Sequence, residues 1–204
     1  MATRGEVEPA VVRMRADARR NRERILTAAR ETFGEYGVDA QMDDIARRAG
    51  VGVGTLYRHF PTKDALVGEL VRLKLGDFAA LARAKFEQDE RPWESFAELL
   101  REQAEIASRD ASQQRMIFAM TQEALDQALP TIEELSAAMQ ALIDRAKAAG
   151  ELRKDLVVDD IRTLMCGLGS IMAADAFGVM PYDWRRHLEF VLAGMRTGCP
   201  DTGA

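Results

Sequence analysis

The stretch MDDIARRAGVGVGTLYRHF, residues 42–60, contains two short helical patterns joined by a glycine-containing turn. Two helices can cross closely only where small side chains lie at the contact and the turn is tight. Ala46 supplies the small side chain, and Gly50 can take the positive φ that the turn requires. Leu56 belongs to the apolar wedge between the two helices. The spacing predicts a helix-turn-helix with helices at about 42–49 and 53–60.

Polar and basic side chains gather on the second of these helices and directly after it. They are Thr55, Tyr57, Arg58, His59 and Lys63. Such side chains can reach phosphates or base edges in a major groove. Lys63 lies at the start of the next helix, where backbone amides and the helix dipole also favour phosphate. The group indicates DNA binding, although a similar turn also occurs in helical hairpins that bind no DNA.

Charge is unevenly distributed along the chain, whose net charge is −5. Residues 1–63 hold 12 Lys and Arg against 9 Asp and Glu, whereas the remaining residues hold 16 against 24. A basic head on an acidic body is typical of a nucleic-acid reader with a separate second domain. The head also contains a run of arginines: Arg13, Arg15, Arg19, Arg20, Arg22 and Arg24. These arginines either follow the DNA backbone or minor groove, or form a solvated helix face.

The composition fits a globular protein, with 47% hydrophobic and 30% charged residues. No apolar run approaches the ~18–20 residues needed to cross a bilayer, and the N-terminus has no signal-peptide core. We therefore expect a cytoplasmic protein without a membrane partner. Cys166 and Cys199 lie 33 positions apart without CxxC spacing, which argues against a disulfide framework and a zinc site. We expect no metal and no cofactor.

Helical periodicity extends through nearly the whole chain, and no stretch shows the alternation of a strand. The sequence therefore predicts an all-α protein. After a disordered arm at residues 1–16, a helix begins near Asp17 and ends at Gly37. Thr62 caps the next helix, and Pro92 fits the first turn of another.

The second half of the chain predicts further helices. A segment at about 112–127 is interrupted by Pro130. Thr131 with Glu134 then forms a capping box for a helix that ends at Gly150. The two most apolar helices come last, at about 157–177 and 182–196.

The stretch MDDIARRAGVGVGTLYRHFPTKDAL, with RERILTAARETFGEYG before it, closely resembles the DNA-binding domain of the TetR (tetracycline-repressor) family. The resemblance covers roughly residues 20–70. It implies a three-helix DNA-binding domain, here at residues 17–63. It also implies a larger, divergent helical domain for dimerisation and ligand sensing, here at residues 64–204.

The resemblance assigns roles to single residues. It implies that Thr55, Tyr57, His59 and Lys63 contact operator DNA, largely its phosphates. Arg58 stands at a variable family position and is the candidate base reader, with guanine O6 and N7 as its target. Gln41 stands where the family usually has a Ser or Thr that caps the first short helix and contacts phosphate. Because Gln is a poor N-cap, the family pattern fails at this position.

The last two predicted helices carry apolar stripes that form either simple core or a dimer interface. The stripes are Ile161, Leu164, Met165, Leu168 and Met172, and then Trp184, Leu188, Val191, Leu192 and Met195. The resemblance favours the interface, because the final two helices of the family usually form a four-helix bundle with the partner subunit.

Aromatic and methionine side chains in the body can line an adaptable pocket, or can be ordinary core. The candidates for an effector pocket are Trp93, Phe96, Met116, Met120, Met165 and Phe177. The resemblance implies an unknown small-molecule effector that binds among the middle helices.

The sequence therefore predicts a dimeric DNA-binding regulator, and the resemblance adds repression relieved by an effector. An enzyme is the first alternative, but neither His59 nor His187 belongs to a Ser/His/Asp set or a metal-ligand cluster in the sequence. A helical ligand-binding or interaction protein without regulated DNA binding is the second alternative. It leaves the grouping of polar residues around Arg58 unexplained.

Overall fold

The computed structural model describes residues 7–88, 91–109, 121–175 and 182–197. Their helices are α1 (Val7–Tyr36), η1 (Gly37–Asp39), α2 (Met42–Ala49), α3 (Val53–His59), α4 (Lys63–Gln88), α5 (Pro92–Arg109), α7 (Gln122–Ala148), α8 (Val158–Asp175) and α9 (Trp184–Met195). Extended pairing among these residues is confined to an isolated bridge between Leu152 and Arg196. The all-α prediction is confirmed.

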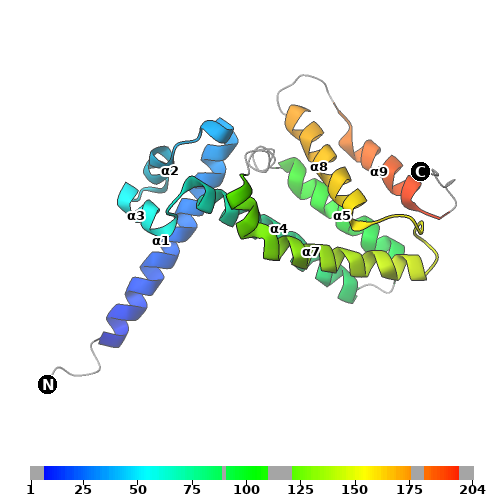
Figure 1. Cartoon of the computed structure of the whole chain (residues 1–204), viewed down its shortest axis with the longest axis horizontal. Helices are drawn as coiled ribbons and strands as arrows, with labels where there is room; N and C mark the ends of the chain where they lie inside the picture. The colour runs from blue at the N-terminus through cyan, green and yellow to red at the C-terminus, as the bar shows by residue number, and fades with distance from the viewer. Residues whose placement is uncertain (1–6, 89–90, 110–120, 176–181, 198–204) are drawn as a thin grey trace.

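The helices form a small head and a larger body, with α4 and α7 between them (Figure 1). The head contains α1, α2 and α3, and the body contains α5, α8 and α9. α4 and α7 run side by side in the same direction, because Gly68 lies against Ala124 and Phe86 lies against Arg145. A Cβ at Gly68 would lie 3.1 Å from the Ala124 carbonyl oxygen, so the glycine permits a close approach of the two helices.

The N-terminal parts of α4 and α7 contribute to one hydrophobic core, and their C-terminal parts contribute to a second one. The head core includes Leu66 and Val71 of α4 together with Ala128 of α7. The body core includes Phe78 of α4 and Leu142 of α7. The head core therefore extends beyond residue 63, the predicted domain boundary, and any shift of either long helix acts on both cores.

The first helix begins at Val7, ten residues before the predicted start at Asp17. The prediction of a disordered arm is wrong for residues 7–16, and residues 1–6 lie outside the described residues. Pro9 does not interrupt the helix because it lies in the first turn, where backbone N–H groups have no partner within the helix. The N-terminal turns of α1 project away from α2 and α3 (Figure 1).

α7 continues through Pro130, so the predicted interruption and the capping box of Thr131 with Glu134 are wrong. The helix begins instead at Gln122, capped by the Thr121 hydroxyl, which accepts from the Ala124 amide at 3.3 Å. Pro130 is exposed, while residues before and after it pack into the head and body cores. Burial on both sides outweighs the backbone hydrogen bond that proline removes. Residues 112–120 of the predicted segment lie outside the described residues.

Most residues of the two C-terminal stripes lie in the core of their own chain. Those buried in the body core are Ile161, Leu168, Met172, Trp184, Leu188, Leu192 and Met195. Leu164, Met165 and Val191 are partly buried against the same core. The prediction that the stripes form a dimer interface is therefore wrong for the buried members. These side chains of α8 and α9 pack in one core with α5 of the same chain, so they are not available to a partner subunit.

Several predicted helix boundaries are confirmed. Gly37 follows α1 with φ 55°, and Gly50 follows α2 with φ 62°. The Thr62 hydroxyl accepts from the Ala65 amide at 3.0 Å at the start of α4, and Pro92 is the first residue of α5. These features need only neighbouring residues, which is why sequence reasoning finds them.

Candidate nucleic-acid interface

The helix pair at the predicted helix-turn-helix is closed by small and aliphatic side chains. Ile45 and Ala46 of α2 and Leu56 of α3 are fully buried. Gly50 takes the left-handed conformation, and Val51 N donates to the Ala46 carbonyl at 3.0 Å. Arg24 of α1 donates from Nη2 to the Gly50 carbonyl at 3.1 Å, which satisfies a backbone acceptor at the turn. The geometry fixes α3 against α2 without using the outer face of α3.

The outer face of α3 is open. Leu56 is its buried residue, whereas Tyr57 is 44% exposed and Thr55 is half-buried. Arg58 is exposed and lies along its own helix. Its Nε donates to the Gly54 carbonyl at 3.0 Å, and Nη2 donates to the Thr55 hydroxyl at 3.3 Å. A guanidinium has five N–H donors, so these two bonds leave donors for a second partner.

His59 and Lys63 lie at the end of α3 and the start of α4. The His59 ring is half-buried beside Phe60, with 6.4 Å between ring centroids. Lys63 is half-buried, and its Nζ lies 5.7 Å from the centroid of the Phe33 ring. This cation–π contact holds the lysine stem against the head core and leaves a charge at the first turn of α4.

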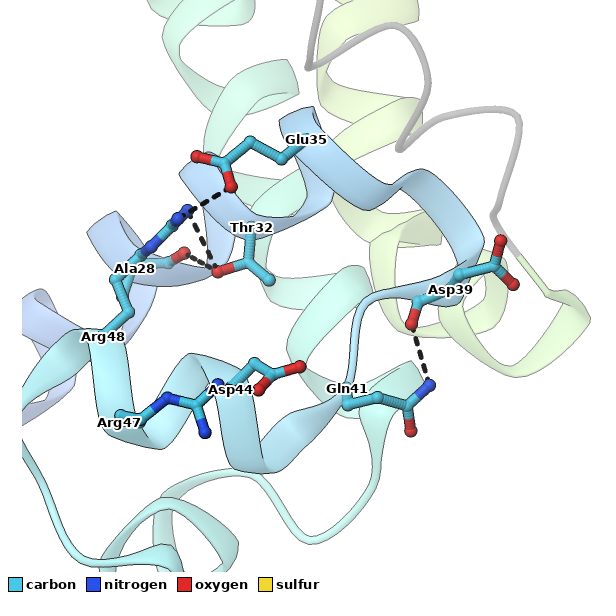
Figure 2. A network of polar contacts seen from close by, with 8 residues as sticks. All are labelled: Ala28, Thr32, Glu35, Asp39, Gln41, Asp44, Arg47 and Arg48. Atoms are coloured by element: carbon cyan, nitrogen blue, oxygen red, sulfur yellow. Dashed lines mark hydrogen bonds and ion pairs between the residues drawn. The ribbon is translucent and has the colours of Figure 1, made fainter.

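Gln41 takes the N-cap position of α2 without capping the helix through its side chain. Its Nε2 donates instead to the Asp39 carbonyl at 2.8 Å, as Figure 2 shows. The expectation that this glutamine is a poor cap is confirmed. A role for Gln41 in DNA binding stays a prediction.

α2 is locked to α1 by a polar contact that sequence reasoning missed. Arg48 donates to the Glu35 carboxylate at 2.7 Å and reaches the Thr32 hydroxyl at 3.5 Å (Figure 2). Thr32 is buried and donates to the Ala28 carbonyl at 2.8 Å. The hydrogen bond from Arg48 lowers the pKa of Glu35, and the charge of Arg48 adds to this effect. Arg48 and Glu35 are 13 positions apart in different helices, so no local pattern reveals the pair.

A second missed contact joins the head to α4. Glu69 is paired both with Arg22 of α1 and with Arg72, whose Nε lies 2.7 Å from a Glu69 oxygen. Arg22 also lies over the Phe60 ring, 5.6 Å from its centroid. The hydrogen bond from Arg72 lowers the pKa of Glu69, and Arg22 acts in the same direction, while burial opposes both. Glu69 therefore stays ionised and ties α1 to α4.

The predicted basic run serves more than one purpose. Arg22 and Arg24 are engaged within the head, as described above. Arg19 and Arg20 make exposed pairs with Glu23 and Asp17 on α1 itself. The side chain of Arg13 lies outside the described residues, and Arg15 is exposed. Arg15, Arg19 and Arg20 stay candidates for a DNA backbone contact because each lies on the solvent side of α1.

Three of the predicted effector-pocket residues, Trp93, Phe96 and Met165, pack in or against the body core. Trp93 and Phe96 are buried in the body core, with 6.0 Å between ring centroids, and Met165 is half-buried on α8. None of these three lines the cavity between α1, α4 and α5 or the one beside α1 and α2. The other predicted pocket residues, Met116, Met120 and Phe177, lie outside the described residues.

No group of three or more His, Cys, Asp or Glu side chains within the described ranges can hold a metal ion. No helix in those ranges is both long enough and apolar enough to span a bilayer.

A buried helix-turn-helix wedge with an open second helix, carried on a helical body, defines a DNA-binding regulator. Comparisons with known proteins agree with this class. Residues 25–70 match the family model described as bacterial regulatory proteins, tetR family, and residues 91–197 match the C-terminal domain of SbtR-like transcriptional regulators.

Individual relatives agree as well. The HTH-type transcriptional regulator RutR of Escherichia coli K12 is 34% identical over 72% of this chain and 67% of its own length. A TetR regulatory protein from Mycobacterium vanbaalenii has a TM-score of 0.60 at 31% identity, over 90% of this chain and 99% of its own. FadR from Bacillus subtilis, solved with stearoyl-CoA, has a TM-score of 0.70 at 20% identity, over 86% and 98%, and shares the fold.

The chain belongs to the TetR family of transcriptional regulators.

Proposed function

We propose that the protein is a dimeric repressor that leaves its operator when a small molecule binds the body. The observation that carries the proposal is the open face of α3, where Tyr57 and Arg58 are exposed and Leu56 alone is buried. α3 packs on the head through one face and carries basic side chains at its end, and a short helix of this kind fits a major groove. Membership of the TetR family supports the DNA-binding half.

A single α3 can read only a few base pairs, so the proposal includes a two-fold dimer. The face of α8 and α9 that the chain leaves open includes Gly167, Phe190 and Ala193, and Phe190 is 64% exposed. A small residue opposite a large apolar one suits close helix packing with a second copy. In the dimer, the two α3 helices would lie about one DNA turn apart, about 34–36 Å centre to centre.

Release from the operator is explained by α4 and α7, the two long helices that contribute to both cores. Because α4 and α7 contribute to both cores, a ligand that moves them in the body also moves the head. The two states of the dimer differ in the spacing of α3, and the ligand shifts the population towards the spacing that does not fit DNA. The proposal assigns the protein no enzymatic activity and places it in the cytoplasm, with its DNA.

The test is salt-dependent binding to the DNA upstream of the protein's own gene, measured by fluorescence anisotropy with the full chain. Binding should weaken steeply with salt because the contacts displace counterions from phosphates. The double variant Tyr57→Ala with Arg58→Ala should lose specific binding, whereas Arg83→Ala, an exposed arginine of α4 in the body, should not. Specific binding that survives in the double variant would place the interface elsewhere than α3.

A further inference from the structure

A cavity of about 360 Å³ lies where α1 meets α4 and α5, away from the open face of α3. Its apolar wall is formed by Leu70, Leu81 and Ile106. Leu70 belongs to the head core and Leu81 packs against the body core, so the cavity lies across the junction of the two. Its size is that of a site for a small molecule.

The side chain of Gln103 marks this cavity as more than a packing gap. Gln103 lines the cavity from α5 and is 8% exposed, with fully buried Leu99, Leu100 and Ala104 beside it in the sequence. Within the described ranges, its amide makes no hydrogen bond. Although the residue as a whole is nearly buried, its amide atoms are not among the fully buried polar atoms without a partner, so solvent in the cavity can reach them. The amide therefore offers a donor and an acceptor to whatever fills the cavity.

Charged side chains of both signs line the same cavity. Arg30 of α1 and Lys74 of α4 contribute the positive charges, and Asp77 and Glu102 contribute the negative ones. Glu102 already pairs with Lys85, whose Nζ lies 3.3 Å from it. Arg30 and Asp77 have neither an ion pair nor a hydrogen bond in the part of the chain that is described.

The charges are also ordered along the cavity. On α4, Leu70, Lys74, Asp77 and Leu81 recur with helical spacing and share one face, running from head to body. The positive end, with Arg30, therefore lies toward the head, and the carboxylates lie toward the body. A purely anionic ligand would meet Asp77, and a purely cationic one would meet Arg30. The arrangement favours a molecule with both charges.

We propose that this cavity binds a small zwitterion of the α-amino-acid class. Its carboxylate pairs with Arg30 and Lys74, its ammonium pairs with Asp77, and its apolar side chain lies on Leu81 and Ile106. The Gln103 amide hydrogen-bonds the same ligand. Charge-assisted pairs in a half-enclosed site give both orientation and selectivity.

Occupation of the cavity ties α1 to α4 and α5, because the ligand bridges residues of all three helices. A bound zwitterion therefore favours one setting of the head on the body. The effect of the ligand on DNA binding, the regulatory half of the proposal, rests on the proposed function. The binding of the zwitterion to the cavity, the other half, does not depend on DNA.

Binding is tested with the full chain and each of the twenty L-amino acids as probe, by thermal shift and then isothermal titration calorimetry. At least one amino acid with an apolar side chain should bind once per chain. Its affinity should fall tenfold or more in Arg30→Ala and in Gln103→Leu, and should be unchanged in Arg83→Ala. The corresponding amine and carboxylic acid, each lacking one charge, should bind far more weakly. The site is overturned if no amino acid binds, if both variants bind as the wild type does, or if either single-charge analogue binds as tightly.

The regulatory half is tested on the same preparations by DNA anisotropy with and without the amino acid. Gln103→Leu should bind DNA as the wild type does but lose the response to the amino acid. An amino acid that binds without changing DNA affinity overturns the regulatory half and leaves the site standing. A chain that binds the amino acid but no specific DNA overturns the proposed function instead.

Discussion

Arg58 lies along α3 in the free protein, with Nε on the Gly54 carbonyl and Nη2 on the Thr55 hydroxyl. Both bonds are at the exposed surface, where water can replace either partner. The guanidinium can therefore leave its own helix for the edge of a guanine, which offers O6 and N7 to a bidentate arginine. Thr55 is then free to turn to a phosphate.

Arg58→Ala should cost about 1–3 kcal/mol of binding to the operator and relax specificity at one base position. The loss is confined to one position because a bidentate contact reads one base. Competition anisotropy against operators substituted at each position measures it, with Arg83→Ala as the matched control. Equal losses on operator and random DNA would show that Arg58 contacts phosphate alone.

Lys63→Ala should weaken binding to all DNA sequences and reduce the slope of log K against log salt by about one. The reason is that a phosphate contact releases a counterion but reads no base. Lys63→Arg keeps the charge over the Phe33 ring and should keep the slope. A slope that is the same in Lys63→Ala and the wild type would remove Lys63 from the interface.

At the scale of the helices, α1 holds both α2 and α4 through charged side chains. Arg48 with Glu35 fixes α2, and Glu69 with Arg22 and Arg72 fixes α4. The side chain of Glu69 is 15% exposed, so its pairs are less screened than those at the open surface. The position of α3 against the body therefore depends on residues outside α3.

Glu69→Gln should lower the free energy of unfolding by about 1 kcal/mol at neutral pH. The folded-state pKa of Glu69 is lowered, so its stabilisation is complete above the usual glutamate pKa of about 4.3 and is lost as pH falls through the folded value. The stability of wild type and variant should therefore converge in acid. Urea unfolding at several pH values measures this, and a constant difference down to pH 3 would contradict it.

Pro130→Ala should raise the stability of the protein. Pro130 is exposed inside α7, and proline costs up to about 3 kcal/mol more than alanine in a helix interior. Thermal unfolding followed by circular dichroism gives the sign. A lower melting temperature would mean that the local geometry at Pro130 is needed to seat Ala128 and Thr131.

At the scale of the whole molecule, the sequence predicted the features that depend on neighbouring residues and missed those that depend on distant segments. The turn at Gly50, the cap at Thr62 and the start of α5 at Pro92 were predictable because each needs only a few neighbouring residues. The run of α7 through Pro130 was not, because two cores that form from distant segments hold it. The same reason hides the Arg48–Glu35 pair and the junction cavity around Gln103.

Phe190→Asp should convert the proposed dimer to a monomer and abolish specific DNA binding, because a buried charge without a partner opposes association. Phe190 is 64% exposed in the single chain, so the substitution should leave the fold intact. Light scattering after size exclusion gives the mass, and circular dichroism checks the fold. A variant that stays dimeric would place the interface outside this face.

DNA reading by α3 of the proposed dimer can be measured by recovering the genomic DNA fragments that the full chain binds and sequencing them, alongside those bound by the Tyr57→Ala, Arg58→Ala double variant. We expect an enriched inverted repeat with half-sites about one helical turn apart, which should be absent from the variant. No enrichment with the wild type, or the same fragments with the variant, would contradict it.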